Sequence, residues 1–322
     1  MSQKYSSIHD EALNKRNLYI FVTFLAVLLL ISSFNFGYRV FAIAAVAYAV
    51  TFIIELLYAK MRKQPIDRTW FITPMVLTLL LPANIPLWIA GVGAATGIFF
   101  GKIIFGGTGK NIFNPALVGA LFITISFISP MTTQWPEVAG SFTTWLGPLD
   151  AAVGATPLNL LSRGMDPGYT VWQFLIGQGP GAIGETFRLG ILLFGGVLIA
   201  LKVVDWRIPI AMLSAVFLFT LIGYLFDRET FIHPQYSLVL GGVMFAAFFV
   251  ATDPVTAPIK PWGKVFYGIG IGLITVIIRH YAAFFEGVMF AIIVMNAIAP
   301  LFDNWRDGPV PELENQEEEA TA

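Results

Sequence analysis

Ten apolar segments constrain the fold of this chain more than any other feature of its sequence. Apolar residues make up 57% of the 322 residues and charged residues only 12%, whereas soluble domains carry about 25% charged residues. Most of the segments approach the ~20 residues that a helix needs to cross a bilayer. We therefore expect an all-α polytopic membrane protein of about ten transmembrane helices, at residues 18–36, 39–58, 70–83, 87–105, 113–130, 188–204, 208–226, 237–252, 265–279 and 284–302.

The Lys and Arg residues predict how these helices are oriented. If the N-terminus is cytoplasmic, 14 of the 19 Lys and Arg residues fall on the inner side and 5 on the outer side. Inner loops of membrane proteins carry the excess of positive charge, so this orientation is favoured. Residues 1–17 then form a cytoplasmic N-terminal segment and residues 303–322 an acidic cytoplasmic tail. The polar start has no small-residue cleavage site, so no signal peptide is expected, and the net charge of −1 gives no indication of nucleic-acid binding.

The third and eighth segments are short and interrupted. The third contains Pro74 and is followed by Pro-Ala-Asn-Ile-Pro at 82–86, and the eighth runs into Ala-Thr-Asp-Pro-Val-Thr-Ala-Pro at 251–258. Each is the third of five segments, and the two run in opposite directions. Paired broken helices are typical of inverted repeats with a binding site near the midplane. We predict a five-plus-five inverted repeat resembling that of urea transporters, with repeats at 18–130 and 188–302.

The ends of broken helices expose N–H and C=O groups that suit cations, phosphates or carboxylates. The candidate contacts for an ion or a second flavin are therefore Asn84, Asp253, Thr252 and Asn114. For Asp253 the alternative is structural, because an aspartate before proline often caps a helix or forms a tight turn. No metal site is predicted.

Other charged residues lie near the predicted helix ends. Lys102 and Glu55 are close to inner ends, where we expect their side chains to extend towards the headgroups. Glu286 begins the tenth segment and is expected to be either an interface residue or a partner of Arg279.

The longest polar stretch, residues 131–187, separates the two repeats and is predicted to lie on the outer face. Loops of this length are usually functional or disordered, and its aromatic residues favour an ordered loop against the membrane interface. Within it, small residues precede Thr156, and Pro157 disfavours a helical conformation at Thr156. The side chain of Thr156 is then available for a bulky group. The alternative is an ordinary turn before a short helix that starts near Pro157.

The Gly154-Ala155-Thr156 triplet, with Asp150 upstream, resembles the site at which a flavin transferase esterifies FMN to threonine through its phosphate. Val153 departs from that pattern, which has Ser or Thr at this position. Three further stretches add to the resemblance, at 109–117, 251–258 and 286–291. From the first helix to residue 302 the chain is similar to the RnfD/NqrB family, whose members belong to Rnf complexes and to sodium-pumping NADH:quinone oxidoreductases. The short N-terminal region favours the RnfD type.

The resemblance implies an electron-transfer subunit of a bacterial inner-membrane complex that couples ferredoxin/NAD redox chemistry to Na⁺ or H⁺ translocation. It implies FMN covalently bound to Thr156, with Gly154, Ala155 and Asp150 as the motif for flavin transfer, and a second, non-covalent flavin (riboflavin). The implied partners are the flavin transferase and the other Rnf proteins RnfG, RnfA, RnfE and RnfC. The residues agree that redox work must be shared, because the chain has no cysteine to hold an iron–sulfur cluster.

Two other functions remain open. The first is a channel or transporter for a small solute, which the inverted repeat supports independently of any flavin. The second is a non-redox scaffold within a membrane complex, in which the broken helices only shape the packing.

Overall fold

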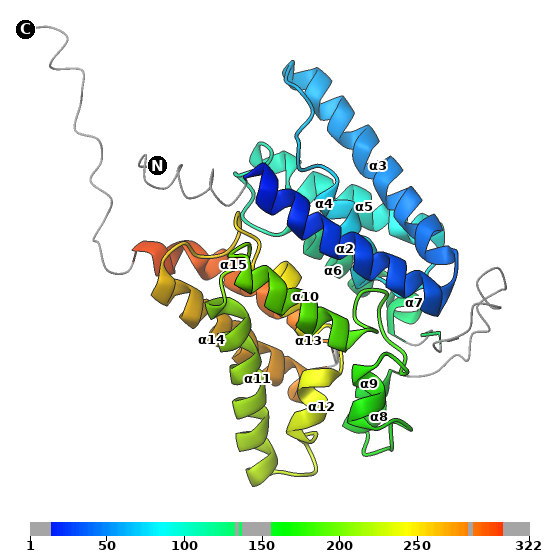
Figure 1. Ribbon diagram of the computed structural model, residues 1–322, viewed down its shortest axis with the longest axis vertical. Helices are drawn as coiled ribbons and strands as arrows, with labels where there is room; N and C mark the ends of the chain where they lie inside the picture. The colour runs from blue at the N-terminus through cyan, green and yellow to red at the C-terminus, as the bar shows by residue number, and fades with distance from the viewer. Residues whose placement is uncertain (1–13, 133–134, 137–155, 283–285, 305–322) are drawn as a thin grey trace, which may run out of the picture.

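The computed structural model describes residues 14–132, 135–136, 156–282 and 286–304. In these residues each of the ten predicted segments contains helix (Figure 1). Five helical stretches are long and apolar enough to cross a membrane, and three shorter apolar helices have 10–17 residues. The chain is therefore a multi-pass membrane protein, as the sequence predicted.

The first half consists of α2 (Lys15–Phe36), α3 (Arg39–Arg62), α4 (Ile72–Leu80), α5 (Leu87–Gly101) with the 3-10 turn η1 (Ile103–Phe105), α6 (Pro115–Ser126) and α7 (Ile128–Thr132). The connection contains two short helices, α8 (Pro157–Ser162) and α9 (Val171–Leu175). The second half consists of α10 (Arg188–Ala200), α11 (Arg207–Phe226), α12 (Pro234–Val239), α13 (Val243–Phe245), the π-helical turn η3 (Ala246–Val250), α14 (Pro261–Tyr281) and α15 (Val288–Asn304).

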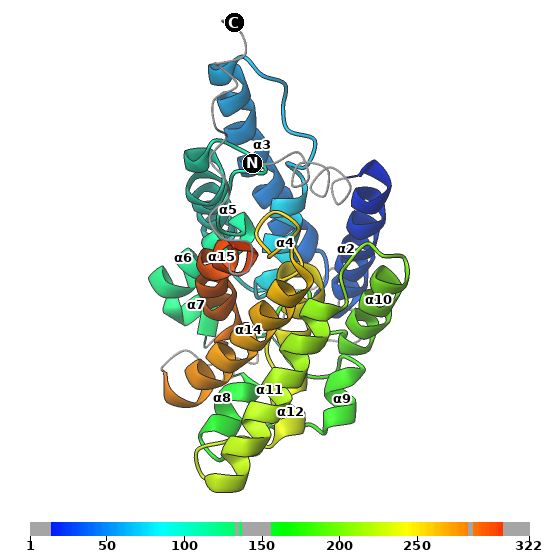
Figure 2. The same ribbon diagram turned by 90° about the vertical axis from the view of Figure 1, so that its left-hand side faces the viewer.

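The two halves pack in the same order. In the first half α5 packs against α3 and α6, and in the second α14 packs against α11 and α15. Across the molecule α2 contacts α10, which lies beside it in Figures 1 and 2, and α6 contacts α15. Equivalent helices therefore meet each other between the halves, as expected for the predicted inverted repeat.

Small residues let the helices approach closely within each half. A Cβ atom on Gly119 of α6 would lie 2.2 Å from the carbonyl oxygen of Gly93 in α5. A Cβ on Gly272 of α14 would lie 2.9 Å from the carbonyl oxygen of Met212 in α11. Membrane helices lack a strong hydrophobic drive to associate, so close backbone contact at glycine is a common source of their packing energy.

Local sequence explains where several helices begin. The side chain of Asn114 caps α6 by accepting hydrogen bonds from two backbone N–H groups of its first turn. Pro115, Pro234 and Pro261 stand in the first turns of α6, α12 and α14, where a proline costs no helical hydrogen bond. Gly37 separates α2 from α3 with a φ of 71°, which favours glycine.

Both predicted interruptions are present. Helix α4 has only 9 residues, and its last carbonyls are satisfied from outside the helix. The N–H groups of Gly184 and Ile183 donate to the carbonyls of Leu79 and Leu81 at 2.7 and 3.0 Å, and Arg39 donates to the carbonyls of 83–85 at 3.0–3.2 Å. The residues before α10 thus enter the helix bundle and lie against the end of α4.

The eighth segment is divided into α12, α13 and η3, with Gly241 at a φ of 69° in the break. Two buried arginines bind the carbonyls at the end of α12. Arg279 donates to Ser237 O and Leu240 O at 2.6 and 2.8 Å, and Arg188 donates to Val239 O. Arginines therefore occupy the negative end of each broken helix, where free carbonyls attract positive charge.

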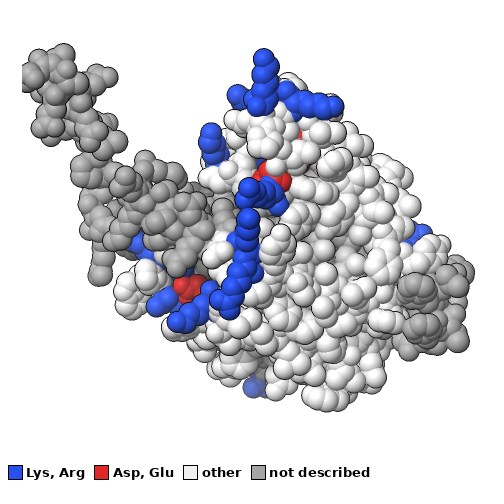
Figure 3. Space-filling view, turned by 45° about the horizontal axis from the view of Figure 1, so that its top comes forward, with Lys and Arg blue, Asp and Glu red and all other residues white. Residues whose placement is uncertain are grey.

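The surface agrees with a bilayer environment. Figure 3 shows Lys and Arg gathered over one region, while most of the remaining surface in that view carries no charge. Large apolar side chains are exposed on the long helices, for example Leu57 on α3 (56%) and Leu225 on α11 (64%). Exposed apolar surface of this extent is unusual in soluble monomers and normal in contact with lipid.

Candidate functional site

Two cavities lie at opposite ends of the broken helices. The start of α4 (Ile72, Thr73) and the residues after η3 line one of them, which we call the inner cavity because the charge distribution predicts it to face the cytoplasm. The end of α4 (Leu79, Leu80) and Gly242 before α13 line the other, the outer cavity. The short helices α4, α13 and η3 therefore form the wall between the two spaces.

Stacked aromatic rings form part of this wall. Phe245 lines the outer cavity and Phe249 the inner cavity, with ring centroids 5.3 Å apart and planes within 17°. Phe21 of α2 lies against Phe249 at 5.7 Å on the inner side. Apolar aromatic rings therefore lie between the two cavities at this point of the wall.

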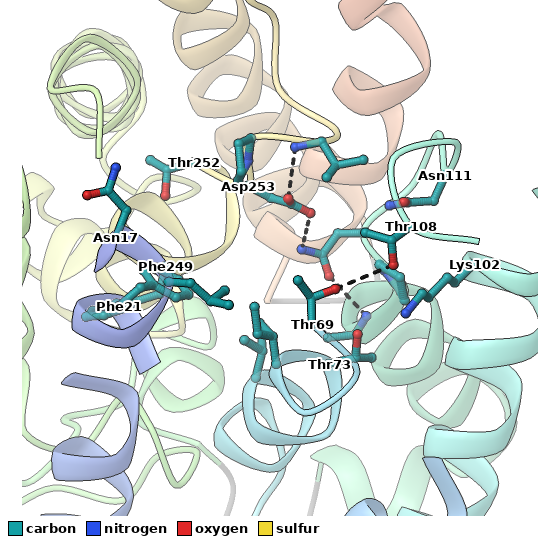
Figure 4. A pocket seen from close by; sticks show the side chains of 18 of the residues that line it. Asn17, Phe21, Thr69, Thr73, Lys102, Thr108, Asn111, Phe249, Thr252 and Asp253 are labelled. Atoms are coloured by element: carbon teal, nitrogen blue, oxygen red, sulfur yellow. Dashed lines mark hydrogen bonds between the residues drawn. The ribbon is translucent and has the colours of Figure 1, made fainter. Parts of the chain in front are cut away.

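The inner cavity has a volume of about 120 Å³ and brings together three of the predicted contact residues. Asn114 donates from Nδ2 to Asp253 Oδ2 at 3.1 Å, and Thr252 lies next to Asp253 on the rim (Figure 4). Asp253 also accepts the N–H of Val255 at 3.1 Å. This is the tight turn expected as the structural alternative for Asp253, so the turn and the cavity position occur together.

The fourth predicted contact residue lies elsewhere. Asn84 is half-buried in the turn after α4, near Arg39, and does not line the cavity of Asp253. Its Oδ1 atom is buried without a hydrogen-bond partner. The matching positions of Asn84 and Asp253 in the sequence suggested one shared site, but the inversion of the repeat places them towards opposite faces.

A cluster of buried charges adjoins the inner cavity, and we call Glu55, Asp67 and Lys102 the inner ion cluster. The Nζ atom of Lys102 lies 2.5 Å from Glu55 Oε1 and 2.7 Å from Asp67 Oδ2. Thr108 and Thr69 donate further hydrogen bonds to Asp67. The expectation that Lys102 and Glu55 extend towards the headgroups is wrong: both are buried, at 4% and 3% exposure, because each satisfies the other.

The electrostatics of the cluster favour the ionised form of Asp67. Burial by itself would raise the pKa of Asp67, but the charge of Lys102 and the hydrogen bonds from Lys102, Thr108 and Thr69 lower it to about 2. Asp67 therefore stays charged at any physiological pH.

The outer cavity is larger, at about 290 Å³, and Thr156 lies on its wall. Thr156 has an extended conformation (φ −59°, ψ 150°) and is the N-cap of α8, where its Oγ1 accepts the N–H of Asn159 at 3.1 Å. The structural alternative for Thr156, a turn before a short helix at Pro157, is therefore present. This turn holds the hydroxyl of Thr156 next to the outer cavity, so the structural role of Thr156 as a helix cap is compatible with a functional role of the same hydroxyl.

Two buried polar atoms in the wall of the outer cavity have no hydrogen-bond partner among the residues that the structure describes. Asn159 Oδ1 and Trp135 Nε1 make no hydrogen bond, although their residues are only 8% and 4% exposed. Unsatisfied buried polar groups cost about 1–3 kcal/mol each, and native proteins usually satisfy them with protein, water or ligand. An acceptor and a donor facing one cavity suit a polar organic ligand. Asp150, Gly154 and Ala155, which were expected from the sequence to form a flavin-transfer motif with Thr156, lie outside the described residues.

The burial of Glu185 and Arg188 at the outer cavity was not predicted from the sequence, whereas Glu286 was expected to be an interface residue or a partner of Arg279, and the two side chains do lie beside each other at Gly241. Glu185 is 5% exposed and Arg188 1%, and they lie three residues apart at the start of α10. Arg279 and Glu286 lie in the same region at the turn between α14 and α15. A Glu and an Arg lie near the predicted outer helix end in each of these two regions, and their recurrence was a usable signal. A sequence does not show, however, that such residues are buried at a helix break.

Comparisons with known proteins agree with this architecture. The family model described as "NQR2, RnfD, RnfE family" matches residues 2–309. The B subunits of the Na(+)-translocating NADH-quinone reductases of Ectopseudomonas mendocina (strain ymp) and Azotobacter vinelandii (strain DJ / ATCC BAA-1303) are each 38% identical to this chain over 274 residues. The match covers 80% of this chain and 65% of each relative, so the chain spans slightly less than two thirds of their length.

Proposed function

Since the chain belongs to the NQR2, RnfD, RnfE family, we propose that it is the flavin-bearing, electron-transferring membrane subunit of an ion-translocating oxidoreductase complex. Within that family we propose the Rnf type, which couples ferredoxin/NAD chemistry to Na⁺ or H⁺ movement. The relatives named above belong to a NADH-quinone reductase, and the proposal of the Rnf type rests on the sequence resemblance alone.

The observation that carries the flavin proposal is the position of Thr156 beside a cavity with unsatisfied polar atoms. FMN would be esterified to Thr156, and its ring would lie in the outer cavity near Trp135 and Asn159, whose free donor and acceptor fit a group with both carbonyls and N–H groups. The volume of about 290 Å³ is at the lower end of small-molecule sites. When bound, a flavin supplies one- and two-electron chemistry that this chain's side chains lack.

The inner cavity is proposed as the place of a second, non-covalent flavin or of the ion path. Asp253 supplies a carboxylate, and Asn114 and Thr252 supply an amide and a hydroxyl on its rim. Cofactors or ions on both sides of the wall formed by Phe245 and Phe249 would divide the route across the protein into two shorter steps. The inner cavity, and both termini, are proposed to face the cytoplasm.

The partners follow from the same proposal. Electrons must come from and return to other proteins of the complex, for which we propose the flavoprotein RnfG, the iron–sulfur membrane proteins RnfA and RnfE and the cytoplasmic RnfC, with a flavin transferase for maturation. The described part of the chain contains no group of three or more His, Asp or Glu residues that could hold a metal. The redox centres of the partners would supply the metal chemistry.

The decisive experiment is flavin fluorescence on a denaturing gel. We expect wild-type protein from cells with the flavin transferase to fluoresce, and Thr156→Ala to lose the signal while still inserting in the membrane. The matched control is Thr170→Ala, because Thr170 caps α9 in the same connection through an equivalent hydrogen bond to Gln173 N. A colourless wild-type band, or equal loss in both variants, would contradict the proposal.

A solute channel of urea-transporter-like fold is the second candidate. The observation in its favour is the pair of cavities at opposite ends of the broken helices. Flux of a small solute through proteoliposomes of the lone chain, removed by blocking the wall at Phe245 and Phe249 with larger side chains, would support it.

A further inference from the structure

The carboxylates of Glu185 and Glu286, which we call the outer carboxylate pair, meet at one glycine. The N–H of Gly242 donates to Glu286 Oε2 at 3.2 Å, and a Cβ atom added to Gly242 would lie 3.4 Å from Glu185 Oε2. Glu185 also accepts the N–H of Ala182 at 2.7 Å. The two acidic groups come from segments 101 residues apart in the chain and are held by backbone at the break before α13.

Two arginines accompany the pair without neutralising it directly. Arg188 and Arg279 use their guanidinium groups on backbone carbonyls, those of Val239 and Phe174 for the first and of Ser237 and Leu240 for the second. Among the described residues, neither carboxylate of the pair forms an ion pair within 4 Å of either arginine. The positive charges of the arginines favour ionised carboxylates nearby, but the two carboxylates still lie close enough to repel each other.

The pair is connected to the outer cavity. Glu185 and Glu286 both line it, together with the orphaned Oδ1 of Asn159 and one further charged residue, Arg163 at the end of α8. The segments of α4, α6 and α13 that line the cavity contribute apolar side chains and Thr124, and no charge. Two like charges in a site of this kind are not both ionised easily, because each disfavours the charge on the other.

We propose that Glu185 and Glu286 form a one-proton site that takes up a proton from the outer cavity for each electron placed on the cofactor there. This inference rests on the proposed function, since it assumes a redox cofactor near Thr156. The described residues offer no third carboxylate at the pair, and a bound metal cation would need several more oxygen ligands than the pair provides. A proton needs only one.

The acidity of the pair agrees with this role. Burial raises the pKa of Glu185 from its ordinary value of 4.5 to about 7, and the charge of Glu286 adds to the increase. Arg188, the Ala182 N–H and Arg279 act in the opposite direction and keep the pKa from rising further. A group that titrates near neutral pH responds to a single added charge nearby.

The charge balance is simple. An electron from a reduced flavin or iron–sulfur centre of a partner protein adds one negative charge to the cavity. In the fraction of molecules in which both groups are ionised, which grows as the pH rises through about 7, one H⁺ from the outer solution then forms an O–H bond on the pair and changes its charge from −2 to −1, so the net charge of the site is unchanged. When the electron leaves, this O–H bond breaks and the proton returns to the outer solution.

The first test is independent of the flavin. The full chain, produced without the flavin transferase, is titrated in detergent while infrared spectroscopy follows the carbonyl stretch of protonated carboxyl groups. We expect one such group to titrate near neutral pH. Glu185→Gln should remove this signal, Glu286→Gln should move it to lower pH, and the exposed control Glu229→Gln should leave it unchanged. Three results would overturn the one-proton site. The signal is absent between about pH 5 and 9, the range of a raised carboxyl pKa, or neither Glu variant changes it, or added Na⁺ displaces it.

The second test connects the pair to the cofactor. In flavin-loaded protein, the midpoint potential of the flavin should fall by about 59 mV per pH unit as the pH rises. This is the value for a tenfold change in proton concentration when one proton is taken up with each electron. Because a reduced flavin also binds protons on its own ring, the slope near neutral pH should become smaller in Glu185→Gln and remain at the wild-type value in Glu229→Gln, and equal slopes in the two variants would contradict the coupling. A pH-independent potential in the wild type would overturn the coupling. A protein that lacks flavin contradicts the proposed function instead, while the infrared result still decides the proton site.

Discussion

The inner ion cluster and the outer carboxylate pair both place carboxylates inside the protein, but different neighbours surround them. In the inner cluster Lys102 contacts both Glu55 and Asp67 directly, at 2.5 and 2.7 Å, so each carboxylate lies against the positive charge. In the outer region the arginines and the carboxylates bind backbone groups at the ends of α12 and α13. Direct contact with an opposite charge keeps a carboxylate ionised, whereas burial beside a like charge favours the uptake of a proton. The difference predicts a structural inner site and a titratable outer site.

The largest expected effect comes from breaking the inner ion cluster. Lys102→Met leaves Glu55 buried without its partner, and we expect a loss of about 3–5 kcal/mol of stability. The control is Lys264→Met, which removes the more exposed ion pair with Asp205 at 2.8 Å and should cost at most about 1 kcal/mol. Thermal unfolding in detergent measures both. Equal effects of the two substitutions would show that the cluster is not a buried ion pair.

A smaller effect is expected from the arginines at the two broken helices. Arg279 is 3% exposed, so Arg279→Met leaves buried carbonyls of Ser237 and Leu240 unsatisfied and should cost about 3 kcal/mol. Arg39→Met should cost less, about 1–2 kcal/mol, because Arg39 is only half-buried and its hydrogen bonds to the carbonyls of 83–85, at 3.0–3.2 Å, are longer than those of Arg279. Melting temperatures of the two variants, compared in one detergent, test the order, and a larger loss for Arg39→Met would reverse the comparison.

The pH dependence of stability should have opposite signs at the two sites. The pKa of Glu185 is raised from 4.5 to about 7, so the unfolded chain loses this proton first and stability falls as pH rises through that window. Glu185→Gln should therefore flatten this fall and raise the melting temperature by a few degrees above pH 7. The pKa of Asp67 is lowered from 3.8 to about 2, so its contribution is present above about pH 4 and lost towards pH 2. Thermal melts of Glu185→Gln and Asp67→Asn across pH test both signs.

The smallest effects concern the two helix caps. Asn114 caps α6 and also binds Asp253, so Asn114→Ala should cost about 2 kcal/mol. Thr156→Ala removes only the cap of the six-residue helix α8 and should cost about 1 kcal/mol or less. Melting curves of both variants in flavin-free protein isolate the caps from any cofactor. A larger loss for Thr156→Ala would indicate that its hydroxyl has a further structural role.

Much of the fold was predictable because a bilayer imposes strong rules on sequence. The ten apolar segments, the short third and eighth segments and the break at Pro82 follow from length and composition alone, whereas the break at 240–242 inside the eighth segment was not located from the sequence. The cap of α8 by Thr156 was foreseen as a local alternative, since Thr-Pro is a typical helix start. Local backbone rules are enough for these features, and no distant residue is needed.

The candidate site was predictable only in part. Asp253, Thr252 and Asn114 come together as an inverted repeat suggests, but Asn84 does not join them. The burial of Lys102 was missed, because its partner Glu55 is 47 residues away and apolar neighbours in the sequence made an interfacial position the simpler expectation. The outer carboxylate pair was missed for the same reason.

Sequence by itself determined that this chain crosses a membrane several times, that its two halves correspond, and that Thr156 lies in the polar connection between them. Those conclusions depend on hydropathy, spacing and local turn chemistry, which act over a few residues. The tertiary structure alone decided which charges meet, because Glu185 reaches Glu286 only after the connection before α10 folds against the end of α4. Charges buried at helix breaks depend on contacts between segments about 100 residues apart, and no local pattern encodes such contacts.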